Sequence, residues 1–341
     1  MYVAKCTKGN DNMNVLVDKK EQDYINILKF IACLLILNSH CRDIYPFYFL
    51  AIGGGWGNSL FFILSGFCLI NINNSFGKWY KKRFLRILPT SAIIIGVDII
   101  MSIVLGKLND WTVGAILWQY INKYWFIWAI LIYYIFYYFI FREKLLNRAL
   151  SSLLVHFAGY NILYYFVLDK SIFSIELEGF SWFKVYFYFS VFLAGGIIRL
   201  FFEKNFLIKN NKKHVSIVLS AVIILSMLLW TGIYGLISVF GIGLKVQNLI
   251  HAAVFIFAVA MLTFAYINKV HICLKNQKLH KLVTQIAKST LEIYVVQIWL
   301  KEYLVNFSFP INWFLFFVCS IIIGILLKEL VAGFTKKRAI H

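Results

Sequence analysis

Apolar runs of about 20 residues recur along the whole chain, separated by short segments that carry most of its charged residues. An α-helix needs about 20 apolar residues to cross the hydrocarbon core of a bilayer. Membrane β-strands would instead give alternating segments of about ten residues, and the sequence shows no such pattern. We therefore expect an all-α fold, a polytopic integral membrane protein with about ten transmembrane helices. The expected spans cover residues 24–42, 50–72, 87–106, 122–141, 149–168, 180–201, 214–235, 247–268, 289–306 and 311–332.

The composition agrees with a membrane protein and argues against a soluble one. Hydrophobic residues make up 61% of the 341 residues and charged residues 14%, whereas soluble domains have about 25% charged residues. The loops between the expected spans are short, so the sequence predicts one membrane domain, residues 24–332. A polar leader, residues 1–23, precedes it, and a basic tail, residues 333–341, follows it. The six cysteines have no paired spacing, so we expect neither a disulfide framework nor a metal site.

The positive charges indicate how the expected spans are oriented. Of the 34 Lys and Arg residues, 26 fall on the side of the N-terminus, six fall on the opposite side, and Lys29 and Lys184 lie inside spans. Because cytoplasmic loops are enriched in Lys and Arg, we expect a multi-pass cell-membrane protein with both termini in the cytoplasm. His40 then lies toward the outer side. The net charge of +19 reflects this topology, and we expect no nucleic-acid partner.

The first expected span carries a polar stripe that ends at a histidine. Lys29 and His40 are 11 residues apart, about three helical turns and about 16 Å of rise, so they face the same direction within roughly 20°. Asn26 and Cys33 lie on the same stripe. Because charged groups inside a membrane are costly and often functional, the stripe predicts the wall of a cavity. Alternatively, Lys29 and His40 extend to the two membrane interfaces and only anchor the helix.

A basic segment, residues 76–89, precedes the third expected span. Its Arg83 and Arg86 share a helix face, Lys82 adds charge, and Pro89 follows. Such a cluster can bind phosphates through bidentate guanidinium contacts. It can also anchor the chain on anionic lipids at the cytoplasmic surface, and charge alone favours this second interpretation.

Other polar residues within the expected spans are candidates for a site or for ordinary buried hydrogen bonds. Ser65–Gly66, in the second span, indicates a close helix contact or a kink, because small residues let two backbones approach. The remaining polar candidates are Asp98, His156, Asn161, Lys184, His251, Glu292 and Gln297.

Several of these segments, taken in order, resemble the acyltransferase-3 family of membrane-bound acyltransferases, whose members have about ten spans. The shared features include a basic residue 11 positions before a histidine, an FF-x-x-SGF signature, and an Arg-x-x-Arg segment followed by proline. Lys29, Asn26 and Gln297 depart from the family, because many members have Arg, Asp and His there. The matching segments are YINILKFIACLLILNSH (24–40), GNSLFFILSGF (57–67), KKRFLRILP (81–89), YWFIWAILIYYIF (124–136) and STLEIYVVQIWL (289–300).

The resemblance implies transfer of an acyl group, most commonly acetyl, from cytoplasmic acyl-CoA to a hydroxyl of a surface polysaccharide or lipid-linked glycan. The expected partners are this donor, the glycan and membrane lipid, with acetyl-CoA acting as a substrate and no cofactor bound permanently. A flippase for lipid-linked sugars is the alternative, although the chain lacks the internal repeat of many transporters. The resemblance assigns catalysis to Lys29 and to His40, the latter as a general base or acyl carrier, donor binding to Arg83, Arg86 and Lys82, and supporting roles to Asn26, Ser65, Trp125, Glu292 and Gln297. Asp43 follows about one helical turn after His40, so we expect it to orient the imidazole if the helix continues that far.

Overall fold

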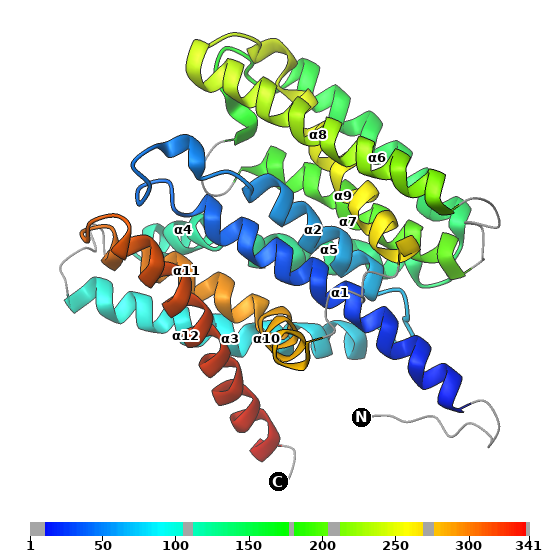
Figure 1. Cartoon of the computed structure of the whole chain (residues 1–341), viewed down its shortest axis with the longest axis horizontal. Helices are drawn as coiled ribbons and strands as arrows, with labels where there is room; N and C mark the ends of the chain where they lie inside the picture. The colour runs from blue at the N-terminus through cyan, green and yellow to red at the C-terminus, as the bar shows by residue number, and fades with distance from the viewer. Residues whose placement is uncertain (1–10, 105–111, 177–180, 204–211, 269–275, 339–341) are drawn as a thin grey trace.

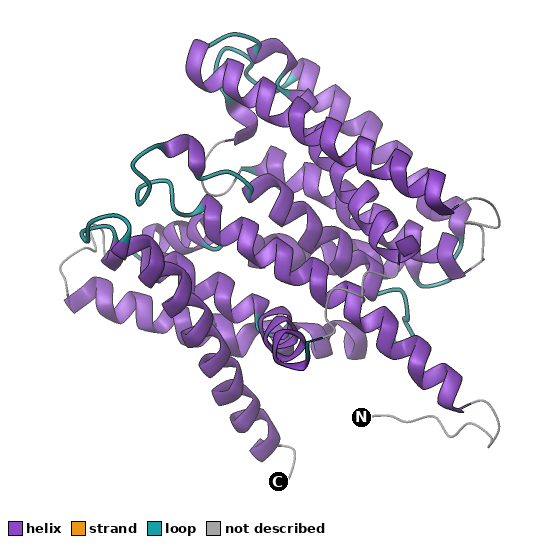
Figure 2. Ribbon diagram, viewed as in Figure 1, coloured by secondary structure: helices purple, strands orange, loops and turns teal. Residues whose placement is uncertain are grey.

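The computed structural model describes residues 11–104, 112–176, 181–203, 212–268 and 276–338, and every regular element within them is a helix (Figure 2). The all-α prediction is therefore confirmed for the described residues. In chain order (Figure 1) the helices are α1 (Asp11–Ser39), η1 (Tyr48–Leu50), α2 (Gly54–Cys68), α3 (Phe76–Val104), α4 (Val113–Lys123), α5 (Trp125–Phe141), α6 (Leu146–Phe166), η2 (Ser174–Glu176), α7 (Trp182–Glu203), α8 (Lys212–Phe240), η3 (Leu244–Val246), α9 (Asn248–Asn268), α10 (Gln277–Lys288), α11 (Thr290–Leu304) and α12 (Ile311–Arg338).

The expected spans coincide with helices, but not every helix is long enough to cross a membrane. Among the described residues, five stretches are long and apolar enough: Phe76–Val104, Trp182–Glu203, Lys212–Phe240, Leu244–Asn268 and Ile311–Gly333. The pair α4 and α5 gives a sixth if it forms one span, bent by 84°. By contrast, α2 and α11 have only 15 residues each, fewer than the about 20 that a crossing requires. Ten membrane spans therefore stay a prediction.

The structure adds helix at places where the sequence predicted loop, leader or tail. Thr112 caps the start of α4, because its hydroxyl accepts a hydrogen bond from the Ala115 amide. Asn276 caps the start of α10, because its side chain accepts one from the Lys278 amide. Such caps satisfy amides that have no partner within the helix. α1 begins within the expected leader, and α12 ends within the expected tail. Residues 1–10 and 339–341 lie outside the described residues.

The helices form layers around α1 and α2, which run side by side through the middle of the molecule (Figure 1). α2 packs on α7, α8 packs on α9, and α11 packs on both α1 and α12. In Figure 1, α6 and α8 lie along the upper edge and α3, α10 and α12 lie below α1. The first turn of α1 and the last turn of α12 both lie at the lower side. This arrangement leaves the two ends of α1 beside different sets of helices.

The close helix contact expected at Ser65–Gly66 occurs at Gly66, where α2 crosses α7. A Cβ atom at Gly66 would overlap the carbonyl oxygen of Phe192, and one at Gly195 would overlap that of Ile63. The hydroxyl of Tyr137 donates a hydrogen bond of 2.6 Å to the Gly66 carbonyl from α5. Glycine is therefore required at this crossing because the two backbones touch.

Aromatic rings fill the space between α2, α5 and α7. Phe62 is completely buried, with its ring centroid 4.5 Å from Phe126, 5.2 Å from Tyr133 and 5.1 Å from Tyr188. Such offset and tilted ring pairs add stability beyond the apolar area that they bury. The cluster holds the first turn of α5, including Trp125, against α7, and this wall faces a cavity.

Candidate active site

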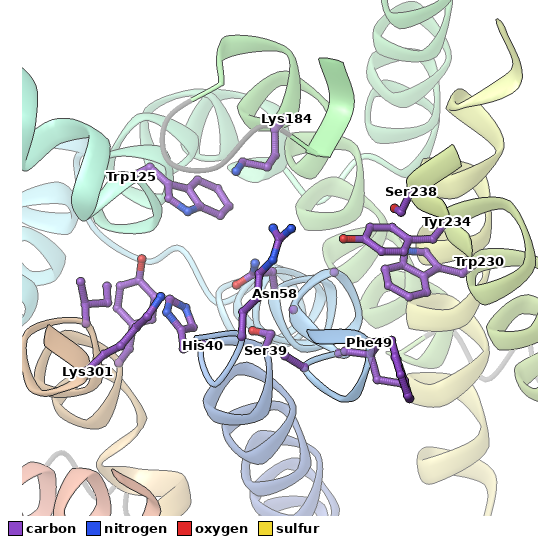
Figure 3. A pocket seen from close by; sticks show the side chains of 18 of the residues that line it. Ser39, His40, Phe49, Asn58, Trp125, Lys184, Trp230, Tyr234, Ser238 and Lys301 are labelled. Atoms are coloured by element: carbon purple, nitrogen blue, oxygen red, sulfur yellow. The ribbon is translucent and has the colours of Figure 1, made fainter. Parts of the chain in front are cut away.

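A cavity of about 770 Å³ opens at the C-terminal end of α1. It is called the His40 cavity here, because His40 lies in its wall together with residues of α2, α4, α5, α7, α8 and α11. Figure 3 shows His40, Lys301, Trp125 and Lys184 on one side and Trp230, Tyr234 and Ser238 on the other. The volume is typical of small-molecule and cofactor sites. Sequence segments more than 250 residues apart thus meet at one site.

His40 is held at the cavity by the turn that ends α1. The helix stops at Ser39, and the His40 amide still donates 3.2 Å hydrogen bonds to the Ile36 and Leu37 carbonyls. Asn38 fixes the following loop, because its Nδ2 donates to the carbonyls of Leu50 (2.8 Å) and Ile52 (2.9 Å). Two sets of hydrogen bonds therefore hold the backbone on each side of the imidazole.

A second link fixes the same turn from α12. The Tyr45 hydroxyl donates a 2.6 Å hydrogen bond to Asn38 Oδ1, and Trp313 Nε1 donates to the Tyr45 hydroxyl at 2.7 Å. Asn38 was not among the predicted site residues. Its polar side chain at the end of an apolar run was the available signal, since such a group needs partners when it is buried.

The charges around His40 favour a neutral imidazole. The ring is partly buried beyond the end of α1, and burial together with the positive charges of Lys301 and Lys184 lowers its pKa below the ordinary value. Lys301 forms a 2.6 Å ion pair with Asp43, and the Lys184 ammonium lies 4.6 Å from the centre of the Trp125 ring. A neutral histidine can accept a proton from a hydroxyl group.

From the sequence, we expected Asp43 to orient the His40 ring if the first helix continued beyond His40. Asp43 does not have this role in the structure. The helix ends at Ser39, and the Asp43 carboxylate pairs with Lys301 instead. Asp43 therefore acts on the site through a lysine of α11.

An ion cluster lies at the wall of the His40 cavity, where α4 meets α5. Lys123 Nζ lies 2.7 Å from Asp98 Oδ2 and 2.6 Å from Glu302 Oε1, and the Tyr124 hydroxyl donates to Asp98 Oδ2 at 3.2 Å. Asp98 is 1% exposed, so its charge requires these partners. The cluster ties α3, α4 and α11 together at the wall that carries Lys301.

A second cavity, of about 580 Å³, lies beside the earlier turns of α1 and is called the Lys29 cavity here. Four cationic side chains and one carboxylate line it, and the Thr90 hydroxyl donates a 3.3 Å hydrogen bond to that carboxylate, Glu292. Its net charge is therefore positive, which favours an anionic ligand. The cationic residues are Lys29, Arg86, Lys288 and Lys328.

The predicted site residues are divided between the two cavities. Asn26, Lys29, Arg86 and Glu292 line the Lys29 cavity, whereas His40 and Trp125 line the His40 cavity. Lys29 and His40 were expected on one stripe bordering a single cavity, but the structure places them in the walls of two different cavities.

The other predicted residues lie outside both cavities. Arg83 donates a 3.0 Å hydrogen bond to the Trp79 carbonyl, and its guanidinium stacks 3.8 Å from the Trp79 ring, so it contacts its own helix. Lys82 is exposed, Ser65 is half-buried on α2, and Gln297 is buried within α11. Among the described residues, no group of three or more His, Cys, Asp and Glu side chains can hold a metal ion.

The comparison with protein families agrees with this arrangement. A family model described as an acyltransferase domain, that of the acyltransferase-3 family, matches residues 22–329. The chain belongs to the acyltransferase-3 family. The match covers all residues that line the His40 cavity and all but Val331 of those that line the Lys29 cavity. Membership of this family favours a membrane acyltransferase over a transporter. Comparisons with curated proteins and with solved structures give no match.

The sequence analysis of this acyltransferase assigned no role to several cations that the structure places at the two cavities. Lys123 and Lys301 are two of only six cations expected on the side opposite the N-terminus, and Lys288 and Lys328 were counted only as loop and tail charges. The scarcity of cations on that side was the available signal. Which of them face a cavity depends on the packing of the helices that carry them, α4, α10, α11 and α12.

Proposed function

We propose that this family member transfers an acyl group, most commonly acetyl, from acyl-CoA to a hydroxyl of a surface polysaccharide or lipid-linked glycan. The observation that carries the proposal is the pair of polar cavities along α1, one rich in cations and the other containing His40. α11 lines both cavities, with Glu292 at the first and Tyr294 and Lys301 at the second. α1 and α11 together thus connect a site for an anionic donor to a site for a base.

The donor binds with its phosphates in the Lys29 cavity. Lys29, Arg86, Lys288 and Lys328 supply donors of charge-assisted hydrogen bonds, which are about twice as strong as neutral ones. Lys29 and His40 are separated by about 16 Å of helix rise, so the long pantetheine arm extends along α1 toward His40. The loop charges favour a cytoplasmic position for the Lys29 cavity and an outer position for the His40 cavity.

His40 acts as a general base in the proposed reaction. Its neutral imidazole takes the proton of the acceptor hydroxyl while the hydroxyl oxygen attacks the thioester carbonyl carbon. The carbon–sulfur bond then breaks, and the imidazolium returns its proton to the leaving thiolate, which gives an ester and free CoA. Lys301 and Lys184 place positive charge beside the oxyanion that forms during attack. In a variant of this route, the imidazole attacks first and carries the acyl group to the acceptor.

The test uses purified protein in detergent, acetyl-CoA labelled in the acetyl group, and surface glycan extracted from cells in which the gene is deleted. We expect transfer of label to the glycan without any ion gradient, because the reaction needs only the two substrates. If the glycan stays unlabelled although the protein is folded, then either acyl-CoA is not the donor or this glycan is not the acceptor. A parallel assay with labelled succinyl-CoA shows whether the protein transfers an acetyl or a succinyl group.

Removing cations from the Lys29 cavity is expected to weaken donor binding. Arg86→Ala combined with Lys328→Ala should raise the KM for acetyl-CoA on the order of ten-fold or more, since each removes a charged contact to a phosphate. The KM for the glycan should not change. Lys82→Ala is the matched control, because Lys82 carries the same charge on the same segment and is exposed like Arg86, but it lies outside the cavity. If Lys82→Ala raised the KM for acetyl-CoA as much, general surface charge rather than the Lys29 cavity would explain donor binding.

Removing the charge of Lys301 is expected to move the acid limb of the pH profile of kcat/KM to higher pH. A protonated His40 cannot accept the hydroxyl proton, and Lys301 helps to keep its pKa low. Lys301→Gln therefore raises the pKa of His40, so activity is lost at a higher pH than in the wild type. Lys301→Arg keeps the charge and should leave the limb in place. If the acid limb of the active Lys301→Gln variant lies at the same pH as in the wild type, the charge of Lys301 does not control the pKa of His40.

A further inference from the structure

The wall of the His40 cavity opposite His40 is formed by one face of α8. Trp230, Tyr234 and Ser238 line it at four-residue intervals, which places their side chains on one face of the helix. In Figure 3 these three residues face His40, Trp125 and Lys301 across the cavity. The reaction proposed above leaves this wall without a function, because His40, Lys184 and Lys301, the groups that it uses, all lie on the other side (Figure 3).

The chemistry of the α8 face differs from that of the opposite wall. The rings of Trp230 and Tyr234 stack with centroids 4.8 Å apart and an angle of 10° between their planes. Trp230 is buried against Trp56, at 4.8 Å, so the pair is anchored in the core, while Tyr234 is half-buried and reaches the cavity. The face therefore offers an aromatic surface beside hydroxyl groups and carries no charge.

Such a face suits a sugar ring. The C–H groups on one side of a pyranose make an apolar surface that packs on an aromatic ring, while its hydroxyls need hydrogen-bond partners at the edge. The Ser238 and Tyr234 hydroxyls and the Asn58 amide lie around the cavity at such positions (Figure 3). A cavity of about 770 Å³ also holds more than the single hydroxyl and acyl group that react.

We propose that the α8 face is the acceptor subsite, where Tyr234, supported by Trp230, stacks on a sugar ring and presents one of its hydroxyls to His40. This inference rests on the proposed function and names the residues that select a sugar over a simpler alcohol. The ring contact holds the glycan at a fixed distance from the base, which raises the effective concentration of the hydroxyl at the reacting carbon.

The test compares Tyr234→Ala with the wild-type protein in detergent, using two acceptors: the surface glycan extracted from cells in which the gene is deleted, and glycerol. Glycerol has hydroxyls but no ring, so it reaches His40 without stacking. Tyr234→Ala is expected to raise the KM for the glycan and to weaken its binding, measured by calorimetry without donor, by about three- to ten-fold. The KM for acetyl-CoA and the rate with glycerol should stay unchanged.

Two further variants show whether the ring itself is responsible. Tyr234→Phe keeps the ring and should retain most of the glycan binding, whereas Tyr165→Ala removes a tyrosine that is 57% exposed on α6, outside the cavity, and should change nothing. Equal losses with glycan and glycerol in Tyr234→Ala would mean a structural role and overturn the subsite. Unchanged glycan binding would also overturn it. If the wild type binds the glycan through Tyr234 but acylates neither acceptor, the proposed function fails and the sugar subsite stands.

Discussion

His40→Ala is expected to reduce acyl transfer by about 10²–10⁴-fold, the usual contribution of a general base. The imidazole lies in the wall of the larger cavity, its pKa is lowered so that it is neutral at neutral pH, and its backbone is fixed by hydrogen bonds on both sides. The loss should appear in kcat, while the KM for acetyl-CoA stays close to the wild-type value because the site proposed for the donor phosphates is the Lys29 cavity. The measurement is label transfer to the extracted glycan by equal amounts of purified protein.

Two controls separate the chemical role of His40 from a structural one. His214→Ala removes an exposed histidine at the start of α8 and should leave activity intact. Added imidazole should restore part of the activity of His40→Ala, because the vacated space opens into the cavity and admits a small base. Wild-type turnover by a folded His40→Ala protein would remove His40 from the mechanism. A labelled protein adduct at His40 after incubation with donor alone would favour the route in which the histidine carries the acyl group.

Gly66→Ala is expected to destabilise the protein more than any other glycine-to-alanine change on α2. The added methyl group would overlap the Phe192 carbonyl oxygen, so α2 and α7 must move apart, and such overpacking typically costs about 1–3 kcal/mol or more. The separation would also disturb the hydrogen bond from Tyr137 to Gly66. We expect a lower midpoint of thermal unfolding in detergent and a lower yield of folded protein.

Gly232→Ala on α8 is the matched control for this change. A Cβ atom at Gly232 meets nothing within 4 Å, so the same substitution should stabilise the helix by roughly 0.5–1 kcal/mol through reduced backbone entropy. Opposite signs for the two variants would identify the helix contact as the cause. A Gly66→Ala protein as stable as the wild type would mean that α2 and α7 are not in backbone contact.

The helices themselves were predictable from local sequence. In apolar surroundings, unpaired backbone amides and carbonyls are costly, so a long apolar run is stable only when each group bonds within its own helix. For this reason each expected span coincides with a helix. Small residues at Ser65–Gly66 separately indicated a close helix contact or a kink, and a close contact occurs at Gly66. α4 and α10 were missed because they are short, and polar caps at Thr112 and Asn276, rather than long apolar runs, define where they begin.

The candidate site was only partly predictable. The helical period places Lys29 and His40 on one face of α1, but it does not show that the face borders two cavities. Arg83 was expected to bind phosphate beside Arg86, yet it stacks on Trp79 of its own helix, because the indole offers a nearby surface for the guanidinium. Asp43 was considered a partner for His40, but it pairs with Lys301, a residue more than 250 positions later.

By itself, the sequence determined the helical class, most helix positions and the family, and it predicted a catalytic role for His40. These properties depend on hydrophobicity, residue spacing and motifs, which act over a few helical turns or are read directly from residue order. The tertiary structure alone decided how the polar residues are divided between the Lys29 and His40 cavities and placed α8 opposite the histidine. These features depend on helix packing, because α1, α8 and α11 are far apart in the chain and come to line one cavity only in the folded protein.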